Sequence, residues 1–307
     1  ITGPITVYGG KVTLAGVGLT STASGAAVKL ISSGDVLVTP GASITTNNGA
    51  ILLAADRDNS GSGGIEVYNA SLTSNGGNIT LGGGAADGSS YAKGLSYTSA
   101  AYTPQSGMGI DIRGNSSSSS STTINAGGGN ILINGKGAAS GTTGQYAIGV
   151  NMVFLPTIQT SGSGTITING VGGVNIDSAT YGAGVNFWSG TSISSASGAI
   201  NITGTSGTGS SSVPSGIFYA GGTGNVSIYS TSGAIGLTGI LATAGTGTAV
   251  SMSGSAIYLG RDSTGNVKTG GNLTITGDSL SLSSSNLDTT GTLTLQPYSN
   301  SFSSAFS

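Results

Sequence analysis

One short phrase recurs along this chain: a glycine, one intervening residue, and then two apolar residues separated by a single position. We call the segments that carry these apolar pairs strands A. An apolar residue at every second position is typical of a β-strand that buries one face. A phrase repeated so often predicts a repeat architecture, in which no unit buries its core alone. The pairs are Ile51/Leu53, Ile79/Leu81, Ile131/Ile133, Ile166/Ile168, Ile200/Ile202, Ile235/Leu237, Leu273/Ile275 and Leu293/Leu295.

Two further segments accompany each strand A. Strands C contribute one apolar residue, set among Ser, Thr and Asn, six to eight residues before strand A: Ile44, Leu72, Ile124, Ile158, Ile193, Ile228, Val267 and Leu287. Strands B lie upstream of strands C and contribute another apolar pair: Val36/Val38, Ile65/Val67, Ile110/Ile112, Val150/Met152, Val185/Phe187, Ile217/Tyr219, Val250/Met252 and Leu280/Leu282. The nearly constant C-to-A spacing predicts a fixed corner, where glycine provides positive φ or a close backbone approach.

Three strands and three turns per unit describe a triangular coil. The sequence therefore predicts an all-β fold, a right-handed parallel β-helix (three-sided β-solenoid) with about nine to ten coils. With Val28/Leu30 as a further strand A and about 4.8 Å between coils, the core is about 40 Å long. We expect residues 1–307 to form a single β-solenoid domain that is a segment of a longer repetitive protein.

The step from strand A to the next strand B varies from 7 to 31 residues. This variation predicts loops at mainly one corner, forming a ridge along the rod. The two insertions that we delimit are residues 82–109 and 115–122. The first carries three aromatic residues, and with one later tryptophan these are the candidate surface contacts for carbohydrate or protein: Tyr91, Tyr97, Tyr102 and Trp188. The alternative is that they pack against their own loops.

Two neighbouring units also match in detail. Tyr146 and Val150-Asn151 recur 35 residues later as Tyr181 and Val185-Asn186. In-register coils would stack the two tyrosines on each other and the two asparagines on each other.

Composition removes much catalytic chemistry. The chain has no His and no Cys, and its formal net charge is −2. We therefore expect no enzyme activity, no catalytic residue, no metal and no cofactor, and we expect neither nucleic-acid binding nor membrane insertion. Glu66 has no obvious carboxylate partner on an adjacent coil. The other local acid–base groups are interpreted as solvated pairs on surface turns: Asp56-Arg57-Asp58, Asp111 with Arg113, and Arg261-Asp262.

Two alternatives stay open at this point. Parallel β-helices also support carbohydrate-active enzymes, lyases or hydrolases, whose sites need convergent acids. Flat solenoid faces with Thr-x-Thr ranks also support ice binding, but the pairs here do not fall on consecutive coils: Thr165/Thr167, Thr274/Thr276 and Thr292/Thr294.

The unit apolar-x-x-x-x-Gly-x-apolar-x-apolar resembles the repeats of filamentous-haemagglutinin-like exoproteins, giant adhesins of the two-partner secretion type. The phrases that carry the resemblance are Ile193-Ser-Ser-Ala-Ser-Gly198-Ala-Ile200-Asn-Ile202, Leu287-Asp-Thr-Thr-Gly291-Thr-Leu293-Thr-Leu295-Gln-Pro297 and Gly3-Pro4-Ile5-Thr6-Val7-Tyr8-Gly9-Gly10. It implies a rod segment, secreted or on the surface of a Gram-negative bacterium, with roles in adhesion, aggregation or biofilm formation. The implied partners are other copies, end to end or laterally, and glycans or proteins of a host or neighbouring cell.

Overall fold

The alternation of apolar and polar residues builds strands throughout the described part of the chain. The computed structural model describes residues 1–84, 87–96, 106–115, 121–139, 146–175, 182–188, 190–209, 215–219, 221–222, 224–242, 247–254 and 256–303. Every regular element in these ranges is a β-strand. No helix in them is long and apolar enough to cross a membrane.

Sheet A collects the strands predicted as strands A, in chain order and all parallel. Its members are β1 (Ile5–Gly9), β4 (Val28–Ser32), β7 (Ile51–Ala55), β10 (Ile79–Gly83), β14 (Ile131–Lys136), β17 (Ile166–Val171), β21 (Ile200–Thr205), β25 (Ile235–Ile240), β28 (Leu273–Thr276) and β31 (Leu293–Gln296). The short β11 (Ala92–Lys93) also pairs with β14.

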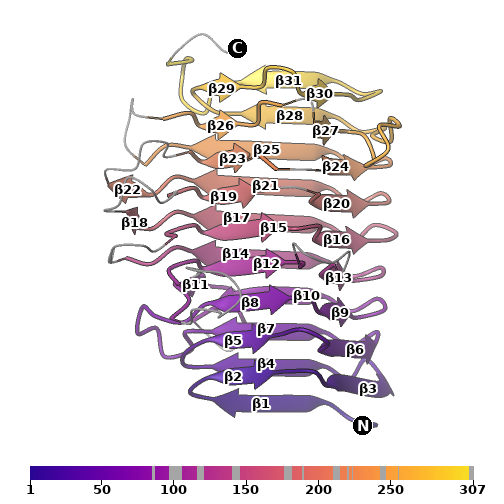
Figure 1. The fold of residues 1–307 in the computed structure, drawn as a ribbon. Helices are drawn as coiled ribbons and strands as arrows, with labels where there is room; N and C mark the ends of the chain where they lie inside the picture. Colours follow the sequence, from indigo (N-terminus) through magenta and orange to yellow (C-terminus); the bar gives the residue numbers. More distant parts are fainter. Residues whose placement is uncertain are drawn as a thin grey trace.

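Sheet B is built in the same way from β2 (Val12–Leu14), β5 (Val36–Val38), β8 (Ile65–Tyr68), β12 (Ile110–Arg113), β15 (Val150–Val153), β19 (Val185–Phe187), β23 (Ile217–Tyr219), β26 (Val250–Ser251) and β29 (Leu280–Ser281). Sheet C contains β3 (Gly18–Ser24), β6 (Ser43–Asn47), β9 (Ser71–Thr73), β13 (Thr123–Asn125), β16 (Thr157–Thr160), β20 (Ser192–Ser195), β24 (Val226–Ser230), β27 (Ile257–Leu259) and β30 (Asn286–Leu287). Each coil adds one strand to each sheet, which confirms the predicted three-sided parallel β-helix (Figure 1).

The core lies between the three sheets and runs along the whole stack. Registers align like residues: Ile131 pairs with Ile79 on one side and Ile166 on the other, and all three are buried. Each inward rank is therefore a continuous apolar column. Because every inward side chain packs against the coils on both sides, stability accumulates from neighbour to neighbour along the axis.

The corner between sheets C and A is closed by buried hydroxyl groups and glycines. Ser195 Oγ donates a hydrogen bond to the carbonyl of Gly164 on the preceding coil (3.0 Å) and accepts one from the Gly198 N–H (3.0 Å). Ser230 makes the same two bonds one coil later. A Cβ on Gly198 would lie 1.8 Å from the Gly164 carbonyl oxygen. Close backbone stacking therefore requires glycine here.

Two strand assignments made from the sequence change. Besides the nine predicted strands A, sheet A contains β1, whose Ile5 and Val7 pair with Val28 and Leu30 of β4. The prediction that Val267 belongs to sheet C is wrong: β27 takes that place, and Leu259 pairs with Ile228 and Leu287. Val267 lies in a loop and is 46% exposed. Val267 has the sequence distance from the next strand A that strands C usually have, but Leu259 is the residue that packs in the core.

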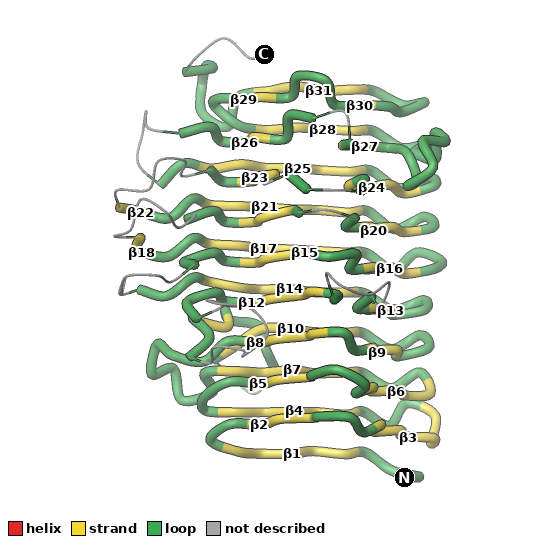
Figure 2. The backbone as a smooth tube through the Cα atoms, in the orientation of Figure 1, coloured by secondary structure: helices red, strands yellow, loops and turns green. Residues whose placement is uncertain are grey.

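Most insertions lie at the corner between sheets A and B, as predicted. Extended connections follow β7, β10, β14, β17, β21 and β25, and two of them carry the paired short strands β18 (Val174–Asn175) and β22 (Thr208–Gly209). They gather on one side of the stack (Figure 2). In the sequence, the delimited insertion 82–109 runs from the end of β10 to the start of β12, and 115–122 falls between β12 and β13. A further long connection, 260–272, joins sheet C to sheet A.

Candidate functional site

The outward face of sheet B carries a rank of side chains that is buried although it points away from the core. Alternation along each strand turns these residues outward, between the inward apolar pairs. Strand register places them next to each other on consecutive coils: Leu37, Glu66, Asp111, Asn151 and Asn186. Glu66 is 1% exposed and Asp111 is fully buried. Such burial of acids requires partners.

The insertion after β10 covers the beginning of this rank. Leu95 and Met108, from its two described flanks, pack with Ile148 against Leu37 in a small second apolar cluster. Asp35 fixes one flank, because its carboxylate accepts hydrogen bonds from the Ser96 hydroxyl (2.6 Å) and the Ser96 N–H (3.2 Å). The insertion is thus fastened to the second coil and shields part of sheet B from solvent.

One guanidinium balances the two buried acids. Arg113 is itself 1% exposed, and it lies 3.2 Å from Glu66 Oε2 and 3.0 Å from Asp111 Oδ2. Its guanidinium carbon lies 3.9 Å from the centre of the Tyr68 ring, a cation–π contact. Asn151 donates to Asp111 Oδ1 at 2.7 Å. Two carboxylates therefore share one cation. We call Glu66, Asp111, Arg113, Asn151 and Asn186 the buried network.

This imbalance sets the protonation of the acids. Burial raises the pKa of Glu66 from 4.5 to about 7; Arg113 opposes the shift and Asp111 adds to it. Burial also raises the pKa of Asp111, against the opposing effects of Arg113 and the Asn151 hydrogen bond. Near neutral pH the protonated and the ionised forms of Glu66 are both populated, so its carboxyl group can either donate or accept a hydrogen bond.

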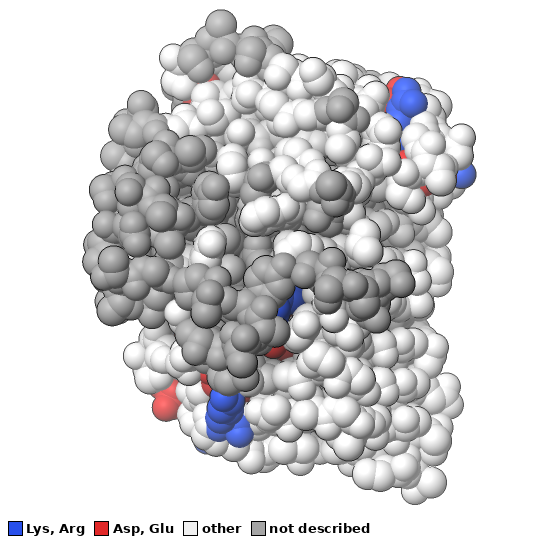
Figure 3. Space-filling view, in the orientation of Figure 1, with Lys and Arg blue, Asp and Glu red and all other residues white. Residues whose placement is uncertain are grey.

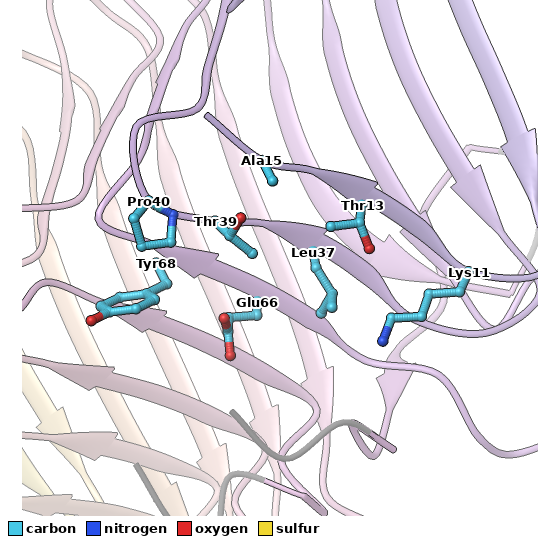
Figure 4. A pocket seen from close by; sticks show the side chains of 8 residues that line it. All are labelled: Lys11, Thr13, Ala15, Leu37, Thr39, Pro40, Glu66 and Tyr68. Atoms are coloured by element: carbon cyan, nitrogen blue, oxygen red, sulfur yellow. The ribbon is translucent and has the colours of Figure 1, made fainter. Parts of the chain in front are cut away.

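The network meets solvent at a groove of about 420 Å³ on the outer face of the first three coils. Its lining comes from β2, β5 and β8, from the residues on both sides of β2 and from those that follow β5: Lys11, Thr13, Ala15, Leu37, Thr39, Pro40, Glu66 and Tyr68. Figure 4 shows Glu66 between Tyr68 and Leu37, with Lys11 at the opposite end of the row. This volume lies within the range of about 300–1,000 Å³ typical of small-molecule sites.

The structure corrects two of the predictions about acidic residues. Glu66 does have a carboxylate neighbour on the adjacent coil, because it pairs in register with Asp111. Asp111 and Arg113 lie buried on β12 and not on a surface turn. The signal was in the sequence: consecutive copies of strand B, Ile65/Val67 and Ile110/Ile112, enclose Glu66 and Asp111.

The remaining acid–base groups stabilise loops. Asp56 is fully buried, pairs with Lys93 of the insertion at 3.2 Å, and does not pair with its neighbour in sequence. Arg261 pairs with Asp288 on the next coil, and Asp262 pairs with Lys268 at 3.4 Å. These contacts hold the loops, and none of them involves a residue that lines the groove.

The aromatic residues predicted as surface contacts are not brought together where they are described. Tyr91 is half-buried in the insertion between β10 and β11. Trp188 follows β19 at a different corner, half-buried, with its ring centre 6.3 Å from that of Phe154. Tyr97 and Tyr102 lie outside the described residues. Sequence reasoning did not select Tyr68, the aromatic residue that lines the groove.

The predicted amide stack is present. Asn186 Nδ2 donates to Asn151 Oδ1 at 2.7 Å, and the two residues pair in register. The matching tyrosine stack involves Tyr181, which lies outside the described residues. The amide pair extends the buried network over a further coil and holds the Asn151 side chain in the orientation that donates to Asp111.

Charged groups are few and scattered over the visible surface (Figure 3). In the described ranges, no three acidic side chains gather in the way that a metal ion requires. The groove and the buried network bring ionisable and apolar groups together on sheet B. Comparison of the chain with protein-family models, curated proteins and solved structures finds no match.

Proposed function

We propose that this chain is a rod segment of an extracellular surface fibre, which serves adhesion, aggregation or biofilm formation. The supporting observation is that the three continuous parallel sheets extend over the whole described chain and leave the side loops at their margin. Such a stack has length, dense backbone hydrogen bonding and many repeated surface positions. Weak contacts at repeated positions add up to strong attachment.

We further propose that copies of this segment associate, end to end or laterally, and that an exposed coil edge is the surface on which another copy stacks. In the described structure β1 pairs only with β4, and β31 only with β28. Both edges expose apolar residues, since Val7 is 36% and Leu293 is 43% exposed. The triplets Ile5-Thr6-Val7 and Leu293-Thr294-Leu295 share one pattern, so a tail-to-head contact would continue the apolar and threonine ranks of sheet A.

The location and partners are part of the same proposal. Resemblance to filamentous-haemagglutinin-like repeats favours a secreted or cell-surface protein of a Gram-negative bacterium. Absence of cysteine fits a fold held together by hydrogen-bond ladders and a core, with no need of disulfides. Glycans or proteins of neighbouring cells are the proposed contacts, with neither nucleic acid nor membrane insertion involved.

Electron microscopy of the purified chain, together with an aggregation assay on cells displaying it, tests the proposal. We expect rods that join end to end and cells that clump. Replacing Val7 and Leu293 by Lys should leave single rods and abolish joining, whereas Lys at the exposed Thr6 should have less effect on the core contact. Isolated particles with no clumping of displaying cells would contradict the proposed fibre role.

A carbohydrate-active enzyme is the second candidate, favoured by one observation. Glu66 and Asp111 lie side by side in register, and the pKa of Glu66 is raised to about 7, within the range of a general acid. The proposal predicts release of reducing ends from a polysaccharide, lost in Glu66→Gln and Asp111→Asn. No product from a panel of neutral and uronic polysaccharides would reject it.

A further inference from the structure

The groove over the first three coils combines features that the fibre role does not use. Glu66 is held by one bond from Arg113 to Oε2, and no described residue donates a hydrogen bond to its second oxygen, Oε1. Its side chain is 2% exposed and nevertheless lines the groove. A buried carboxyl group with an unused acceptor at the margin of a cavity is suited to a ligand that brings its own hydroxyl group.

The other lining groups have matching chemistry. Thr13 and Thr39 bring hydroxyl groups and Lys11 brings an ammonium group, so donors and acceptors lie around the groove. Leu37, Pro40 and the Tyr68 ring supply apolar surface. The lining contains one acid and one base, hence no strong net charge. Alternating apolar and hydrogen-bonding groups complement a molecule whose C–H faces alternate with hydroxyl edges.

We propose that this groove binds a mono- or disaccharide unit of a glycan. Glu66 bonds a sugar hydroxyl, Lys11 bonds a second oxygen at the opposite end, and Tyr68 with Leu37 supports a ring face. The inference rests on the proposed function, because it names the class of surface partner that an adhesive rod would contact. It assigns that contact to the flank of the solenoid near its first coils and not to the insertion tyrosines.

The buried network acts as the support of this site. Arg113 holds Glu66 through Oε2 and is itself held by Asp111 and by the Tyr68 ring. Asn151 fixes Asp111 from the next coil. Arg113, Asp111 and Asn151 are thus positioning residues: they keep the Glu66 carboxyl group in place, so little orientation entropy is lost when a sugar binds.

Other ligand classes fit less well. A peptide strand needs unpaired backbone groups, whereas β5 is paired on both sides, with β2 and with β8. A polyphosphate or nucleic acid would meet the Glu66 carboxyl group with only one lysine among the lining residues. A saccharide requires neither a free edge nor a cationic surface.

The test is a binding measurement by nuclear magnetic resonance and calorimetry on the full chain. The probes are cellobiose, maltose, chitobiose and digalacturonic acid, followed by a glycan array. We expect at least one sugar to bind and to shift the backbone amides of β5 and β8. At pH 8, where Glu66 is mostly ionised, Glu66→Gln should weaken that binding by about tenfold, since a neutral amide replaces the charged acceptor.

Matched variants locate the site. Lys11→Gln should weaken binding, while Lys29→Gln, on the outer side of sheet A in the next coil, should not. Tyr68→Leu should weaken binding, while Tyr229→Leu on sheet C should not. Circular dichroism of each variant establishes that the fold is retained, and Tyr68→Phe should keep most of the affinity if the ring face is the contact.

The outcomes separate this inference from the fibre proposal. Binding that survives Glu66→Gln and Lys11→Gln, or no binding to any probe or array sugar, overturns the groove assignment. Rod joining and cell clumping are read independently, so rods without sugar binding reject the groove alone. Sugar binding in the groove without rods or clumping would reject the fibre role and leave the groove standing as a sugar site.

Discussion

Removing the carboxyl group of Glu66 should abolish a specific part of the pH dependence of stability. The pKa of Glu66 is about 7 in the folded chain, against 4.5 for an ordinary glutamate. Folding therefore favours the protonated form. The stabilisation of the folded chain that comes from this raised pKa is fully present below pH 4.5 and is lost as pH rises through 7. The shift corresponds to about 3 kcal/mol of unfolding free energy lost between pH 4.5 and 8.

Glu66→Gln keeps an oxygen that can accept from Arg113 and cannot ionise. The variant should match the wild type at pH 5 and exceed it at pH 8 by about 3 kcal/mol. Asp111, whose pKa is raised in the same direction, is present in both proteins but interacts with Glu66, so the difference between them measures Glu66 together with this interaction. Asp35, the other acid that raises the pKa of Glu66, is also unchanged.

The assay is chemical denaturation at pH 5 and pH 8, followed by far-ultraviolet circular dichroism and by the fluorescence of the single tryptophan, Trp188. A carbon-13 titration of the Glu66 carboxyl group measures the pKa directly. Parallel pH profiles for wild type and Glu66→Gln, or a titration midpoint near 4.5, would show that the site is hydrated and that the reasoning from burial is wrong.

Two more substitutions test the buried network and the corner. Arg113→Met should cost about 3–5 kcal/mol of unfolding free energy, because two acids lose their cation, and adding Asp111→Asn should recover part of the loss. A loss below about 1 kcal/mol would mean that the network is solvated. Gly198→Ala should destabilise strongly, because its Cβ would lie 1.8 Å from the Gly164 carbonyl oxygen. Gly128→Ala is the control, since nothing lies within 4 Å of its added Cβ; equal melting temperatures for the two variants would contradict close coil stacking.

Much of the fold could be predicted because the repeat is local. Inward positions such as Ile131 and Ile166 follow from alternation, and the glycine of each corner follows from its constant distance to strand A. Val267 shows where spacing fails: an exposed loop residue occupied the expected distance, and only packing identified Leu259 as the core residue.

The candidate site was harder to predict because it depends on register across a long insertion. Glu66 and Asp111 are separated by 45 positions in the sequence, yet they are immediate neighbours in sheet B. Aligning the copies of strand B predicts that Glu66 and Asp111 are neighbours. No pattern in the neighbouring sequence, however, indicates that the outward face of these strands is buried. The sequence therefore predicts a solvated pair of Asp111 and Arg113 and no carboxylate partner for Glu66.

The sequence by itself determined the coil: which residues form strands, which face turns inward, and where the corners lie, because these depend on neighbours two to eight positions apart. The tertiary structure decided the environment of the outward rank. The insertion folds back and packs Leu95 and Met108 on Leu37. The stacking of coils brings Glu66 and Asp111 together around one cation, Arg113. Long-range packing excludes water there, and exclusion of water changes ordinary surface acids into a buried network with a raised pKa.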